Sequence, residues 1–167
     1  MKIIGTALLV CFLIFVTIFA KVLSNKNTST DPSIRIVLPI LYTENQIFDT
    51  DDLIGHPYII NVFASWCTTC QEEHNLWLEI SKKKIIDIYG INYLDTEHKV
   101  QQWLKVHGNP YTQIAKDYSG KVANILGVTG VPETFVFNKN GKIILHIHGN
   151  ISKDIWENQI LQLVQNL

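Results

Sequence analysis

Two cysteines separated by two threonines, Cys67 and Cys70, are the residues whose type and spacing most directly indicate chemistry. Thiols at this spacing can close a disulfide within one turn of a helix. A thiolate at the first turn is stabilised by free backbone N–H groups and by the helix dipole. Cys67, at the helix tip, would then attack a disulfide of another molecule, and Cys70 would resolve the mixed disulfide. The pair predicts thiol–disulfide exchange.

Metal binding is the main alternative, because one Cys-x-x-Cys pair is also half of a zinc site. The third cysteine, Cys11, lies in an apolar N-terminal segment, so a four-cysteine site cannot form within one chain. Gln71 follows Cys70, which differs from the haem-attachment pattern. His146 and His148 alternate on a predicted strand, but the sequence names no third ligand for them. We predict no metal and no cofactor, with a copper- or haem-handling chaperone as the alternative.

The elements around the cysteines favour the redox interpretation. Tyr58–Ala64 is a nearly continuous apolar run, typical of a strand that is buried on both faces. A helix is predicted from Cys67 to about Ile80, so the pair lies where a buried strand passes into a helix. Trp66, directly before the thiol, is predicted to shape a docking surface; the alternative is a partly buried aromatic residue.

The remaining elements define the fold class. They are strands at Ile34–Leu41, Ile85–Tyr93, Gln113–Ala115, Thr134–Asn138 and Lys142–His148, and helices around Val100–His107, Val122–Leu126 and Trp156–Leu167. Lys139-Asn140-Gly141 between the last two strands predicts a hairpin. The order β-α-β-α-β-α-β-β-α predicts an α/β fold in which a mixed sheet has helices on both faces.

The first residues of the chain predict a membrane anchor. Ile3–Ala20 carries no charge, and eighteen helical residues span about 27 Å, close to the thickness of the hydrocarbon layer. We predict a transmembrane signal anchor over residues 1–23, a polar linker over 24–33 and one folded domain over 34–167. A cleaved signal peptide is the alternative, although cleavage after Ala20 would place Ile18 where a small residue is preferred.

Composition excludes two other classes of protein. Hydrophobic residues make up 47% of the 167 residues, which is too many for a chain that is disordered throughout. Fourteen basic and fifteen acidic residues give a formal net charge of −1, so the chain lacks the basic footprint of a nucleic-acid-binding protein.

Several segments together resemble one known family. Trp66-Cys67-Thr68-Thr69-Cys70, Ile88–Tyr93, Gly108–Tyr111 and Gly130-Val131-Pro132-Glu133-Thr134 are similar to the membrane-anchored thiol:disulfide interchange proteins of cytochrome c biogenesis, the CcmG/DsbE group of the thioredoxin superfamily. The resemblance covers about residues 34 to 165.

The resemblance implies a thioredoxin-like fold and a specific biological setting. A single-pass protein of the inner membrane would present its C-terminal domain to the periplasm. There it would reduce apocytochrome c or a cytochrome c maturation protein, and a membrane thiol-disulfide carrier would supply its electrons. Another anchored thioredoxin-like reductase or oxidase, with a different client, is the alternative.

The resemblance also assigns roles to residues around the cysteines. It implies that the Val131–Pro132 bond is cis and helps to dock the substrate, whereas an X-Pro bond is trans by default. It places Glu73 and Glu133 at acidic family positions that would tune the thiols or transfer protons. The alternative is that both carboxylates are solvated surface charges. The family usually has proline where this chain has Thr68, which affects the expected redox potential.

Overall fold

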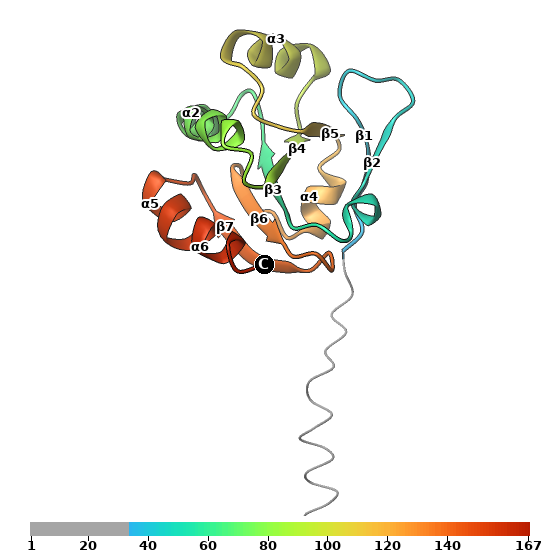
Figure 1. The fold of residues 1–167 in the computed structure, drawn as a ribbon. Helices are drawn as coiled ribbons and strands as arrows, with labels where there is room; N and C mark the ends of the chain where they lie inside the picture. Colours follow the sequence, from blue (N-terminus) through green and yellow to red (C-terminus); the bar gives the residue numbers. More distant parts are fainter. Residues whose placement is uncertain (1–33) are drawn as a thin grey trace, which may run out of the picture. The chain divides into compact units, whose positions relative to one another are not determined.

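A computed structural model describes residues 34–167, which build a five-stranded mixed sheet with the strand order β5-β4-β3-β6-β7 (Figure 1). Its strands are β3 (Tyr58–Phe63), β4 (Asp87–Tyr93), β5 (Gln113–Asp117), β6 (Glu133–Phe137) and β7 (Ile143–His148). The first three run parallel to one another, β6 is antiparallel to β3, and β7 is antiparallel to β6. The thioredoxin-like α/β architecture that the sequence predicts is confirmed.

Helices and a small second sheet cover the two faces of this sheet. The helical segments are α2 (Thr68–Lys82), α3 (Glu97–His107), α4 (Lys121–Ile125), α5 (Lys153–Ile155), a π-helical turn (Trp156–Ile160) and α6 (Leu161–Val164). Residues of α2, α3 and the C-terminal helical segments pack into one core cluster. Residues of α4 pack into the other cluster, together with the two-stranded sheet of β1 (Val37–Pro39) and β2 (Ile47–Asp49).

The central strand β3 shows why the apolar run takes this place. All six of its residues are buried. Ile59 belongs to the cluster under α2, and Ile60 belongs to the cluster on the opposite face. A strand covered on both faces buries consecutive apolar residues rather than alternate ones. This burial fixes the end of β3, and therefore the point at which the chain turns into α2.

Two elements differ from the sequence prediction. β2 and the 3-10 turn that follows it, Thr50–Leu53, were not predicted. β2 is only three residues long, too short to show the alternation that identifies a strand. The elements that the sequence predicts within residues 34–167 do form, although their ends shift. For example, β4 begins at Asp87 rather than Ile85.

No helix within residues 34–167 is long and apolar enough to cross a membrane. The predicted anchor over residues 1–23 and linker over 24–33 lie outside the described residues and stay predictions.

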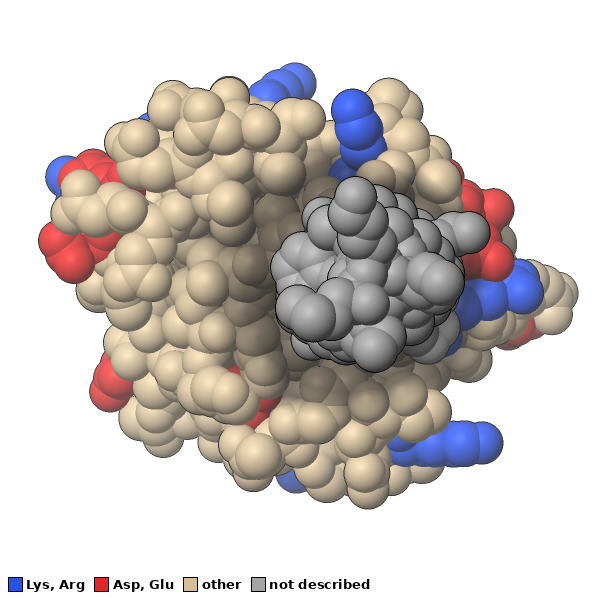
Figure 2. All heavy atoms as spheres, turned by 90° about the horizontal axis from the view of Figure 1, so that it is seen from below, with Lys and Arg blue, Asp and Glu red and all other residues tan. Residues whose placement is uncertain are grey.

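Charged side chains lie scattered around the rim of the face seen in Figure 2, and uncharged residues make up most of the described surface in that view.

Candidate active site

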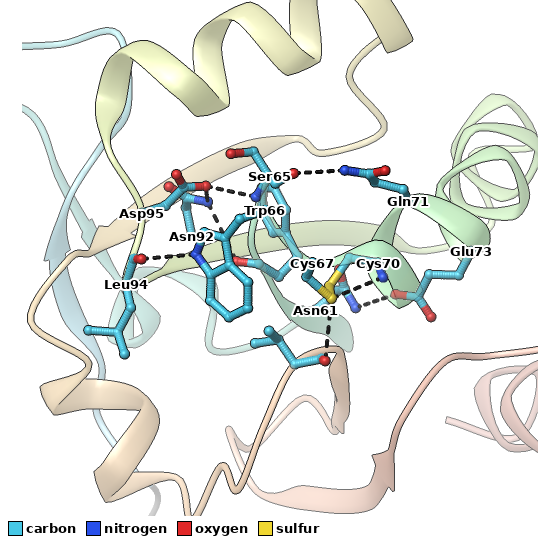
Figure 3. The surroundings of a disulfide bond; sticks show 12 residues. Asn61, Ser65, Trp66, Cys67, Cys70, Gln71, Glu73, Asn92, Leu94 and Asp95 are labelled. Carbon is cyan, nitrogen blue, oxygen red and sulfur yellow. Dashed lines mark hydrogen bonds between the residues drawn. A yellow bond between two sulfur atoms is a disulfide. The ribbon is translucent and has the colours of Figure 1, made fainter.

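The two cysteines lie at the first turn of α2, where β3 ends and the chain turns into the helix. Cys67 is the N-cap of α2 and has extended backbone angles, while Cys70 lies one turn further on. The two form a disulfide with a Cα–Cα distance of 5.3 Å (Figure 3). The backbone N–H of Cys70 also donates a hydrogen bond to Cys67 Sγ at 3.1 Å. A helix N-terminus that donates to Cys67 Sγ would also stabilise a thiolate there once the pair is reduced.

The two cysteines are buried, whereas the neighbouring Trp66 is exposed to solvent. Cys67 is 6% exposed and Cys70 is 3% exposed, whereas Trp66 is 53% exposed. Both cysteines are therefore buried in the disulfide form, and Cys67, at the tip of α2, follows directly after a large aromatic side chain at the surface. This arrangement suits attack by Cys67 and resolution by Cys70.

The loop before β6 lies directly against the disulfide. The Val131–Pro132 peptide bond is cis, as the family resemblance implies and contrary to the trans default. The carbonyl oxygen of Val131 lies 3.4 Å from Cys67 Sγ, although the two residues are 64 positions apart in the sequence. Val131 and Pro132 therefore form one wall of the site.

The Ser65-Trp66 turn is held by three side chains, of which Asp95 was not identified from the sequence. Asp95 accepts a hydrogen bond from the backbone N–H of Ser65 at 2.7 Å. Trp66 Nε1 donates to the carbonyl oxygen of Leu94 at 3.0 Å, and Gln71 Nε2 donates to the carbonyl oxygen of Ser65 at 2.9 Å (Figure 3). These bonds fix the turn that presents Cys67.

Glu73 is buried one turn beyond Cys70 rather than solvated. It is 3% exposed, so the surface-charge alternative is wrong for this residue. Its Oε1 accepts hydrogen bonds from Trp77 Nε1 at 2.9 Å and Asn61 Nδ2 at 3.1 Å, and its Oε2 accepts one from the backbone N–H of Ile151 at 2.7 Å. Burial raises the pKa of Glu73 to about 7, although these hydrogen bonds partly offset that effect.

Asn61 is a site residue that the sequence analysis missed. Its Nδ2 donates to Glu73 and, at 3.3 Å, to Thr134 Oγ1, while its Oδ1 accepts from Tyr111 Oη at 2.8 Å. Asn61 therefore connects the Glu73 carboxylate to Thr134 on β6 and to Tyr111 in the segment before β5. The available signal was its position, because it is the one amide within the apolar run of β3.

Glu133 is buried as well, and its hydrogen bonds lead to the loop that carries Val131 and Pro132. It is 2% exposed, so the surface-charge alternative is wrong here too. Its Oε1 accepts hydrogen bonds from Thr129 N at 2.8 Å, Thr129 Oγ1 at 2.9 Å and Gly130 N at 3.1 Å. Its Oε2 lies 2.6 Å from His146 Nε2. Burial opposes ionisation of Glu133, but the bonds from Thr129, His146 and Gly130 outweigh it and lower the pKa to about 2.

Comparison with known proteins agrees with this geometry. The sequence matches the Redoxin family over residues 26–161. It is 32% identical over 170 residues to the thiol:disulfide interchange protein DsbE of Vibrio cholerae, covering 95% of this chain and 92% of that protein. It is 37% identical over 133 residues to DsbE of Escherichia coli K12, covering 79% and 71% of the two chains.

The chain belongs to the DsbE (CcmG) group of the thioredoxin superfamily. As a member of this group, and with its Cys67–Cys70 pair, it is a thioredoxin-like protein-disulfide oxidoreductase. The fold is shared with a putative DsbE from Chlorobium tepidum, with a TM-score of 0.68 and 23% identity, covering 80% of this chain and 96% of that one. A DsbF structure in mixed oxidised and reduced forms has a TM-score of 0.69 and 21% identity, covering 78% and 96%.

Proposed function

We propose that this DsbE-type protein is a periplasmic reductant in cytochrome c biogenesis. Its client would be the haem-binding cysteine pair of apocytochrome c, or a maturation protein that carries the same disulfide. A membrane thiol-disulfide carrier would return the Cys67–Cys70 pair to the dithiol. Residues 1–23 would anchor the chain in the inner membrane and place residues 34–167 in the periplasm.

One observation carries the proposal: Cys67 at the tip of α2 lies against the Val131 carbonyl and beside the exposed Trp66. The sulfur thus lies against the backbone of Val131, and the residue before Cys67 exposes an aromatic side chain. An extended client segment could pair with the backbone near Val131, as a local form of strand addition, while Trp66 packs against it. The similarity to DsbE proteins supports the choice of client class.

The exchange would proceed in two steps. The Cys67 thiolate attacks one sulfur of the client disulfide, which forms a Cys67–client disulfide and releases the other client sulfur as a thiolate. The Cys70 thiolate then attacks Cys67 Sγ, which forms the Cys67–Cys70 disulfide and releases the second client thiolate. Two electrons pass from this chain to the client, and both client thiolates take up protons.

Glu73 would take part as a proton acceptor and as a negative charge behind the pair. With a pKa of about 7 it changes protonation near neutral pH, which suits proton exchange with the Cys70 thiol. In its ionised form it would disfavour a nearby thiolate and raise the thiol pKa. Glu133 would act indirectly, by positioning the loop that bears Val131 and Pro132.

A Cys70→Ser variant tests the proposal. With no resolving thiol, this variant should accumulate a mixed disulfide between Cys67 and its client, and a Cys67→Ser variant is the matched control that should trap nothing. Identification of the trapped protein as an apocytochrome or maturation protein would support the assignment. Trapping of many unrelated secreted proteins would contradict the dedicated role. A metal- or haem-handling chaperone would trap nothing and would lose its ligand in either variant.

A further inference from the structure

A second cluster of chemically active side chains lies on β6 and β7 and shares Glu133 with the surroundings of the disulfide. Among residues 34–167, Glu133, His146 and His148 form a group whose potential ligand atoms all lie within 4.8 Å of one another. His148 pairs with Glu133 across the two strands, and His146 is two residues earlier on β7. Side chains at such positions project from the same face of the sheet.

The two oxygens of Glu133 face different imidazoles, and only one of them also accepts bonds from the loop. Its Oε1 is occupied by the three loop donors from Thr129 and Gly130. Its Oε2 lies 2.6 Å from His146 Nε2, while His148 Nδ1 lies 3.3 Å from Oε1. The loop therefore holds the carboxylate so that Oε2, which accepts none of the loop bonds, is free to act as a monodentate ligand beside His146, with His148 next to Oε1.

The two histidines lie against each other at the edge of the sheet. Their ring centroids are 4.1 Å apart, and the His146 ring also stacks on Phe135 at 4.0 Å. The His146 side chain is 25% exposed and the His148 side chain is 61% exposed, whereas Glu133 is 2% exposed. The cluster thus has a buried, fixed acidic side and an open side that is accessible to water and ions.

We propose that Glu133, His146 and His148 form a binding site for a divalent transition metal of the Zn²⁺ class. Two imidazole nitrogens and one carboxylate oxygen, with water in a fourth position, make a donor set that Zn²⁺ accepts. Ligand atoms around tetrahedral Zn²⁺ are about 3.3 Å apart, given bond lengths of about 2.0–2.1 Å. His146 Nε2 would have to move away from Oε2 by roughly 0.7 Å to reach that spacing. The His146 side chain is 25% exposed, and we expect it to make this shift toward solvent.

The site would join β6 and β7 at the base of the loop that contacts Cys67. A metal ion on Oε2 would leave the three loop bonds to Oε1 in place. It would connect the edge strand β7 to Glu133, which holds Thr129 and Gly130 immediately before Val131. The inference rests on these contacts and not on the redox role proposed above.

Zn²⁺ titration of the full-length chain tests the proposal, with Cys11, Cys67 and Cys70 all changed to serine so that no thiol binds the metal. Isothermal titration calorimetry should show one Zn²⁺ per chain. An outer-shell partner of a metal ligand contributes about 10–100-fold in affinity, so loss of a ligand in His148→Ala should weaken binding at least tenfold. His98→Ala, at an exposed histidine of α3, is the matched control and should bind as tightly as the parent.

Substitution of the largely exposed His148 leaves the core contacts of Glu133 intact, so folding should be preserved; circular dichroism checks this. In the parent, NMR should show Zn²⁺-induced shifts at the imidazoles of His146 and His148 and not at His98. Absence of saturable Zn²⁺ binding would overturn the proposal. So would equal affinity of the His148→Ala and His98→Ala variants.

Discussion

Glu73 and Glu133 are both buried carboxylates near the disulfide, yet their pKa values move in opposite directions. Glu73 is 3% exposed and Glu133 is 2% exposed, but the pKa rises to about 7 in one and falls to about 2 in the other. Glu73 accepts three hydrogen bonds, whereas Glu133 accepts three loop bonds and also faces two imidazoles. Burial alone therefore does not set the charge of a carboxylate; its partners do.

The difference separates two kinds of role around one disulfide. Glu73 keeps a proton to near neutral pH. Glu133 is ionised over the whole physiological range and holds the loop around Thr129 and Gly130. We infer that Glu73 acts on the chemistry of the thiols and Glu133 acts on their surroundings.

Removal of the Glu133 side chain should give the largest effect. A Glu133→Ala variant leaves two loop N–H groups and the Thr129 hydroxyl without their acceptor, and breaking a buried charged interaction costs about 3–5 kcal/mol. The free energy of unfolding, measured by urea denaturation, should fall by about that amount. Glu72→Ala, at the exposed neighbour of Glu73, is the control and should change it by less than about 0.5 kcal/mol. If Glu133→Ala lowered the free energy of unfolding by no more than Glu72→Ala does, Glu133 would have no structural role in the loop.

The raised pKa of Glu73 should make stability depend on pH with the opposite sign to the lowered pKa of Glu133. Between the unfolded pKa of 4.5 and the folded pKa of about 7, Glu73 holds a proton in the native state but not in the unfolded state. Stability therefore falls as pH rises through this window, by about 3 kcal/mol in total for a shift of this size.

Urea denaturation at several pH values measures this slope. Glu73→Gln should flatten the decline between pH 4.5 and 7, whatever its effect on absolute stability, while Glu72→Gln should keep the wild-type slope. An unchanged slope in Glu73→Gln would show that the carboxyl group titrates normally.

A Glu73→Gln variant should also lower the pKa of the Cys67 thiol in the reduced protein. Removal of the negative charge makes the thiolate less unfavourable, and we expect a shift of roughly one unit. The rate of alkylation by iodoacetamide as a function of pH measures this value. Glu72→Gln provides the matched loss of one charge at the surface of α2. Equal thiol titrations in the two variants would exclude the tuning role.

Substitution of Trp66 should give the smallest change and leave both carboxylates unaffected. Trp66→Ala should slow exchange with a disulfide-containing protein client roughly tenfold, about 1.4 kcal/mol, and exchange with oxidised glutathione far less, because only the protein covers the aromatic surface. Ile47→Ala, at an exposed apolar residue of β2, is the control. Stopped-flow measurement of the exchange rates with the protein client and with oxidised glutathione tests this. Equal slowing with both substrates would show that Trp66 affects the thiol chemistry and not docking.

The sequence predicts the chemistry of this site better than its surroundings. Local patterns were sufficient for the strand–Cys-x-x-Cys–helix unit and for the hairpin at Lys139-Asn140-Gly141, because each depends on neighbouring residues. The burial of Glu73 and Glu133 depends on segments far away in the chain, such as Ile151 and His146. The roles of Asn61 and Asp95 were missed for the same reason, since an amide or carboxylate shows its partners only after the strands have assembled.

Asn61 has a consequence for how the sheet aligns during folding. It lies opposite Thr134 in the pairing of β3 with β6, and its amide finds acceptors and a donor only in that alignment. A slip of β3 by one residue would turn the amide to the other face, away from Thr134 and Tyr111 and against the apolar cluster around Ile60, and would deprive Glu73 of one of its donors. A single polar residue within an otherwise uniform apolar strand thus selects one alignment among several that hydrophobic burial alone would tolerate.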